Sequence, residues 1–165
     1  KTGLVERGHR ENLLDASVLF SLEELRAVTG YNGAIALERL GDLEQSPTYD
    51  SRHFRAEGRP ESFDVAYRVY RPRTEDEAIE RYEALLKKTP NAEERDEIGD
   101  RSLRGHEGPI LAAGALDKEK RLVILLTCGQ SQCRDQSQVA AMLRRMMERI
   151  DRLEPATVPA ASDAP

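Results

Sequence analysis

The sequence predicts an α/β domain of the α+β type, in which helices pack on a twisted, mainly antiparallel sheet of about five to six strands. Residues 122–126 are apolar at every position, which is typical of a strand buried on both faces. A second apolar run, residues 111–116, precedes it across the charged residues 117–120, and this order indicates a hairpin. Further along the chain, apolar residues recur at steps of three and four and predict a long amphipathic helix: Val139, Met142, Leu143, Met146, Ile150 and Leu153.

Length and composition limit the classes of protein that fit. A chain of 165 residues matches one domain, which can bury roughly two thirds of its unfolded surface without metals or several disulfides. We expect a flexible lead-in over residues 1–12, a single domain over 13–153 and a disordered tail over 154–165. The net charge of -5, with both signs interspersed, gives no basic footprint and argues against nucleic acid as a partner.

No stretch approaches the roughly eighteen apolar residues that a transmembrane helix needs. The chain starts with Lys1 rather than methionine, so we expect that an upstream segment has been removed, either a tag or a targeting segment. The sequence alone does not separate these two origins.

Two helices are marked by capping residues. Ser21 and Glu24 form the pattern of a capping box and Gly30 supplies a terminator, which predicts a helix over residues 22–29. Thr74 and Glu77 repeat the pattern, and an apolar stripe follows that stops before a proline.

Strands are less clearly marked. Residues 34–37 and 49–54 each suit a strand, although turn-forming residues are scattered between them. From Phe63 to Val69 apolar residues alternate with more polar ones, which predicts a strand with one polar-leaning face. Residues 91–109 are charged and rich in turns, with Ile98 and Leu103 as the expected anchors into the core.

The two cysteines, Cys128 and Cys133, flank the predicted turn between the last strand and the last helix. A tight turn containing Gly129 can bring their α-carbons within the range that a disulfide requires, so we expect a local disulfide. Three alternatives stay open at this stage. In the first, both cysteines are free thiols, as in a reducing cytosol. In the second, Cys133 is a reactive thiolate at a helix start, and in the third the pair binds a metal ion together with His106 or His53.

No arrangement in the sequence identifies a catalytic or metal site, and no cofactor is indicated. His9, His53 and His106 are far apart and have charged neighbours, so exposed surface histidines are the expected interpretation. A catalytic trio could join one of them to Ser102 or Ser131, but no nucleophile-elbow pattern surrounds either serine. The glycines near residues 99–108 lack the lysine and hydroxyl of a phosphate loop, and the acidic residues 93–97 lack the spacing of a calcium loop.

The order of these elements resembles small lipoprotein domains of unknown function from actinobacteria, and more loosely the PsbP/Mog1-like fold. The resemblance is carried by residues 21–30, the strand 64–70 with the helix that contains Ala78, residues 98–100, the hairpin, and residues 126–133. It implies an exported domain, periplasmic or associated with the outer membrane and often held by an upstream lipid anchor, with a cytoplasmic location as the alternative. It implies no catalytic residues. We therefore expect a non-enzymatic binding or assembly module that meets a protein partner at the bacterial cell envelope, with a thiol-redox or other enzyme using Cys128 and Cys133 as the alternative.

Overall fold

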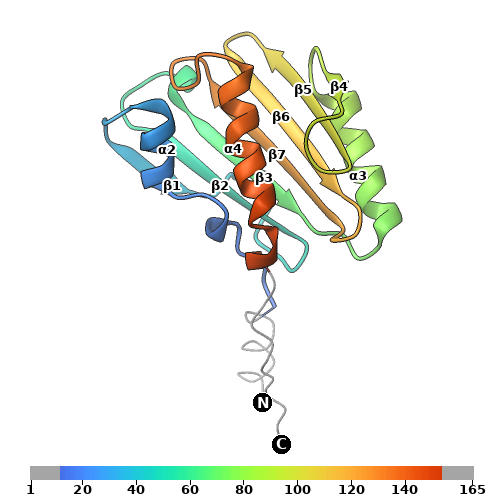
Figure 1. Cartoon of the computed structure of the whole chain (residues 1–165). Coiled ribbons are helices and arrows are strands. Elements are labelled where there is room, and N and C mark those ends of the chain that lie inside the picture. The colour runs from blue at the N-terminus through green and yellow to red at the C-terminus, as the bar shows by residue number, and fades with distance from the viewer. Residues whose placement is uncertain (1–11, 154–165) are drawn as a thin grey trace, which may run out of the picture.

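A computed structural model describes residues 12–153 as an α+β fold built on one antiparallel sheet of seven strands (Figure 1). The strands are β1 (Ile35–Glu38), β2 (Tyr49–Ala56), β3 (Val65–Tyr70), β4 (Glu93–Arg95), β5 (Arg101–Glu107), β6 (Ile110–Asp117) and β7 (Leu122–Gly129). The helices are α2 (Leu22–Thr29), α3 (Glu75–Lys88) and α4 (Gln136–Glu148), with the short 3-10 turns η1 (Ala16–Val18), η2 (Glu61–Phe63) and η3 (Ile150–Leu153). The predicted tail and, apart from Asn12, the predicted lead-in lie outside the described residues.

The sheet order is β1-β2-β3-β7-β6-β5-β4, and every pairing is antiparallel. The predicted antiparallel sheet with packed helices is confirmed, and β7 is the middle strand, as its unbroken apolar run predicted. The count of five to six strands was wrong, because residues 91–109 supply both β4 and β5. The residues of β4 and β5 are largely charged and show no strand pattern. Backbone hydrogen bonds between β5 and β6, rather than alternating side chains, therefore define this part of the sheet.

Alternate residues of β7 serve two separate cores. Leu122, Ile124 and Leu126 lie in the core under α4, whereas Val123 and Leu125 lie in the core under α3. The two helices therefore cover opposite faces of the sheet, and α4 lies across the central strands in front of the sheet in Figure 1. No helix between residues 12 and 153 has the length and apolar character that a membrane span requires.

Helix α2 begins and ends where the sequence predicted. Ser21 accepts from the amide of Glu24, Glu24 accepts from the amide of Ser21, and Gly30 ends the helix with φ 78°. At α3, Thr74 caps the amide of Glu77, but the side chain of Glu77 accepts from Arg73 rather than completing the box.

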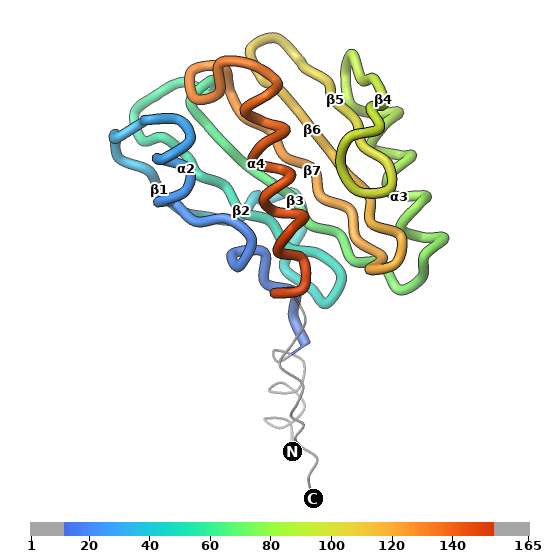
Figure 2. Tube along the Cα trace, in the orientation of Figure 1, coloured from blue at the N-terminus to red at the C-terminus, as the bar shows by residue number. Residues whose placement is uncertain are grey.

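Two other predicted boundaries moved. Phe63 lies in η2, so the third strand starts at Val65. The last helix ends at Glu148, and the chain then tightens into η3, which still buries Ile150 and Leu153. Because η3 and η1 are in contact, the chain enters and leaves the fold at the same end of the sheet (Figure 2).

One ion-pair cluster fastens α2 to α4. Glu24 accepts from both terminal nitrogens of Arg149, one of them at 2.6 Å, and from Arg145 at 3.2 Å. The terminal nitrogen of Arg149 that makes the 2.6 Å bond also donates to the carbonyl of Leu19 at 3.0 Å. The hydrogen bonds from Arg149 are the main reason that the pKa of Glu24 falls to about 2.

Candidate functional site

The two cysteines lie on the α4 side of the sheet. Cys128 belongs to β7 and Cys133 precedes α4, and a disulfide joins them with an S–S distance of 2.07 Å and a Cα–Cα distance of 6.0 Å. Both residues are 0% exposed. Neither sulfur can meet a substrate in this state, so the arrangement holds the β7–α4 connection rather than presenting a thiol.

The histidines and serines considered from the sequence do not come together. Nε2 of His53, on β2, lies 3.1 Å from Oδ2 of Asp64, while the hydroxyl of Ser102 donates to the carbonyl of Arg95. Ser131 shares a hydrogen bond with Ser62.

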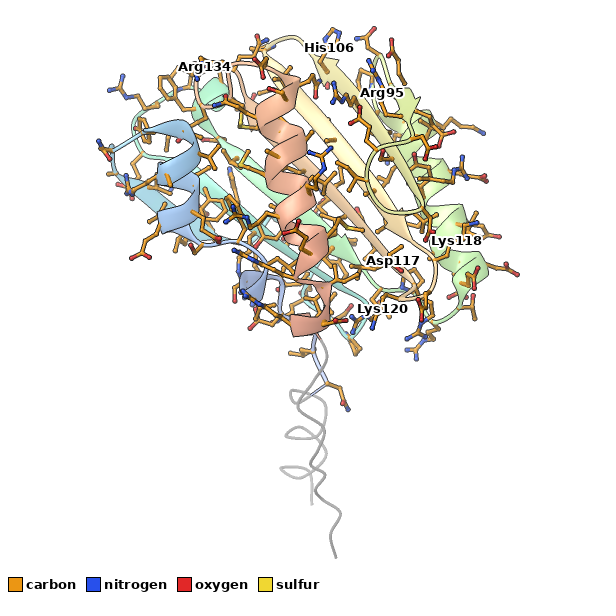
Figure 3. All side chains as sticks on the ribbon, viewed as in Figure 1. Arg95, His106, Asp117, Lys118, Lys120 and Arg134 are labelled. Carbon is orange, nitrogen blue, oxygen red and sulfur yellow. A yellow bond between two sulfur atoms is a disulfide. The ribbon has the colours of Figure 1, made fainter. Side chains whose placement is uncertain are left out.

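His106 is the second-last residue of β5, at the upper rim of the sheet, and is exposed (Figure 3). His9 lies outside the described residues. Across residues 12–153, no three His, Cys, Asp or Glu side chains are placed so that they could hold a metal ion.

A concave feature lies on the other face of the sheet, beside α3. We call it the α3 groove and divide it into two chambers that share Tyr70 as a lining residue. The wide chamber has a volume of about 740 Å³ and is lined by α3 and the β1–β2 connection, with charged side chains from Glu44, Arg73, Glu77, Glu80 and Arg81. The narrow chamber has a volume of about 320 Å³ and lies between the end of α3 and strands β3, β7, β6 and β5.

Asp42 stands at the narrow chamber and is held from three sides. Its carboxylate accepts from Arg68 Nε at 2.7 Å, from the hydroxyl of Tyr49 at 2.9 Å and from the amide of Leu43 at 2.8 Å. Partial burial raises the pKa of Asp42, but the hydrogen bonds from Arg68 and Tyr49 outweigh it and leave the pKa below its usual value. Burial and the bond to Asp42 both raise the pKa of Tyr49. The carboxylate is therefore charged and largely occupied at neutral pH.

The narrow chamber combines apolar walls with polar groups at its rim. Ala112 and Leu125 line it from the sheet, and Leu85 and Pro90 line it from the end of α3. The polar lining residues are Asp42, Arg68, Lys88, Thr89, His106, Glu107 and Thr127. A cavity that combines apolar walls with converging polar groups is a usual form of a small-molecule site.

The sequence did not mark any residue of this groove as part of a binding site. His106 was considered only as a surface histidine, a catalytic residue or a metal ligand. The lining residues come from α3, the β1–β2 connection and four strands, and no short motif records that convergence. One signal was present in the sequence. Arg68 lies in a strand that is otherwise mostly apolar, on the face predicted to lean polar.

Comparisons with protein families, with curated proteins and with solved structures find no match to this chain. The α3 groove is therefore interpreted from its own geometry.

Proposed function

We propose that this protein is a non-enzymatic binding module of the bacterial cell envelope and that the α3 groove is its binding site. The observation that carries the proposal is the narrow chamber, where apolar walls and a half-buried arginine line one cavity. In this groove a partner can bury apolar contacts and find polar ones at the same time.

The cell-envelope setting rests on different support. A disulfide is typical of exported proteins and uncommon in a reducing cytosol. An antiparallel sheet with helices on both faces agrees with the resemblance to PsbP/Mog1-like lipoprotein domains, and we propose this fold family and an upstream lipid anchor together with the function. The module would be periplasmic or associated with the outer membrane.

The alternative is a thiol-redox enzyme that uses Cys128 and Cys133. A reactive pair needs an accessible sulfur, and both residues are 0% exposed in the core under α4. The burial of both sulfurs favours binding over redox catalysis.

The test is photo-cross-linking in the native cell. A photoreactive amino acid replaces Glu80, which lines the wide chamber, or Glu148, an exposed glutamate on α4 and the matched control on the opposite face. We expect a discrete cross-linked product in the envelope fraction from position 80 and none from position 148. Equal products from both positions, or a protein found only in the cytosolic fraction, would overturn the proposal.

A further inference from the structure

We infer that the narrow chamber of the α3 groove binds a small molecule with an apolar body and one acidic group, with Arg68 as the residue that receives the acid. The inference rests on the proposed binding function of this groove and deepens it by naming the class of ligand.

The size of the chamber sets the first limit. A volume of about 320 Å³ lies at the lower end of the range of roughly 300 to 1,000 Å³ that small-molecule pockets occupy. Leu85, Pro90, Ala112 and Leu125 line it, so these walls offer hydrocarbon surface to a ligand, beside the polar groups at the rim. An acyl chain or a small ring suits these walls, because burying its apolar surface against them is favourable.

The hydrogen bonds at the rim then select the polar end of the ligand. A guanidinium has five N–H donors, and in Arg68 only Nε is engaged, by Asp42. Its two terminal nitrogens have no hydrogen-bond partner among the residues that the structure describes. Asp42, in contrast, already accepts three hydrogen bonds. The ion pair therefore offers free hydrogen-bond donors and little capacity to accept further hydrogen bonds. A carboxylate is the group that accepts two such hydrogen bonds from a guanidinium in a bidentate contact.

Arg68 is also suited to this role by its environment. Its side chain is 25% exposed, so it is partly shielded from water but still reachable. Burial lowers the pKa of Arg68, yet the contact with Asp42 outweighs it and keeps the arginine charged. Lys88 at the end of α3 adds a second cation at the rim, and Glu107 on the β5–β6 hairpin offsets it. Recognition of the acid therefore depends on the donors of Arg68 more than on net charge.

The experiment uses three probes that share one eight-carbon chain: octanoate, octanamide and octylamine. Each is titrated at neutral pH into the disulfide-bonded protein, with affinity measured by calorimetry and the site mapped by amide chemical shifts. We expect octanoate to bind and to shift the amides of Ala112, Leu125 and Thr127. Octanamide should bind at least about tenfold more weakly, because hydrogen bonds to charged groups are the stronger ones. Octylamine should bind no better than octanamide.

Variants separate the role of Arg68 from simple hydrophobic capture. Arg68→Gln should weaken octanoate about 10- to 100-fold, to the level of octanamide, and leave octanamide unchanged. Arg55→Gln is the matched control, because Arg55 lies on the neighbouring strand β2, is also ion-paired, with Glu38, and does not line the chamber. Ala112→Leu narrows the chamber and should weaken octanoate and octanamide alike. Circular dichroism checks that each variant stays folded.

Several results would overturn the inference: octylamine binding as tightly as octanoate, octanoate affinity unchanged in Arg68→Gln, or chemical shifts that map away from the chamber. Absence of binding by all three probes also overturns it, and a position-80 cross-link would then still support the proposed function. Octanoate binding without any cross-link would instead support the ligand class and count against the envelope partner.

Discussion

The contact between Glu24 and Arg149 allows a quantitative prediction about stability. Replacing Glu24 by Gln removes the negative charge and keeps the shape, and glutamine at this position can still complete the capping box with Ser21. Arg149 then keeps its bond to the carbonyl of Leu19 and loses its carboxylate partner. The substitution therefore isolates the ion pair that fastens α2 to α4.

The pKa of Glu24 gives the magnitude. A fall from 4.5 to about 2 corresponds to roughly 3 kcal/mol of extra stability for the charged form. The two side chains are 23% and 17% exposed, so water screens the pair, and we expect the Glu24→Gln variant to lose about 1 to 2 kcal/mol of unfolding free energy at pH 7. Because the folded pKa is depressed, this stability is complete above pH 4.5 and is lost as the pH falls toward 2.

Urea unfolding of the wild type and the Glu24→Gln variant at a series of pH values between 7 and 2.5 measures both effects. Glu23→Gln is the matched control, because Glu23 lies exposed in the same turn of α2, and its stability should stay within about 0.5 kcal/mol of the wild type. The difference between Glu24→Gln and the wild type should shrink steadily below pH 4.5. If that difference is under about 0.5 kcal/mol at pH 7, or if it does not change with pH, the ion pair does not have the role assigned to it.

Two further predictions concern the β7–α4 connection. Mass spectrometry under non-reducing conditions should show a deficit of about two hydrogens and no thiol to label, and replacing both Cys128 and Cys133 by Ser should cost about 2 kcal/mol, because the bond closes a short loop. Two readily alkylated cysteines in protein from an oxidising compartment would contradict the pairing. Gly129→Ala should destabilise the fold by about 1 to 3 kcal/mol in thermal unfolding, because an added Cβ would lie 2.0 Å from the carbonyl oxygen of Ser62. Gly41→Ala, which meets nothing within 4 Å, should leave the melting temperature nearly unchanged, and equal effects at the two glycines would refute the steric argument.

Much of the fold could be predicted from local signals. Ser21 and Glu24 defined α2 because a capping box depends on residues three positions apart, and Ile98 and Leu103 were correctly predicted to anchor the charged segment 91–109 in the core. The apolar run of β7 predicted its central place because both of its faces are covered. These features depend on neighbours in the sequence, so the sequence displays them directly.

The features that were missed depend on distant contacts. All three residues of β4 are charged and exposed, and only their pairing with β5 makes them a strand. Asp42 lies in a turn with no distinctive sequence pattern. Its role at the α3 groove follows from its hydrogen bonds with Tyr49 of β2 and Arg68 of β3. The candidate site could not be predicted, because the residues that form it share no spacing or motif.

The strand order separates strand pairings between sequence neighbours from one pairing between distant segments. Strands β1, β2 and β3 pair in sequence order, as do β4, β5, β6 and β7, and the two groups meet along the single pairing of β3 with β7. That pairing joins Tyr70 to Val123 and Val65 to Cys128, so it closes a loop that contains α3 and three strands. Within each group contacts form between near neighbours and need little loop closure, whereas the β3–β7 pairing pays the entropy of the long loop before it gains any hydrogen bond. The middle of the sheet is thus the part whose formation depends on the two groups of strands having come together.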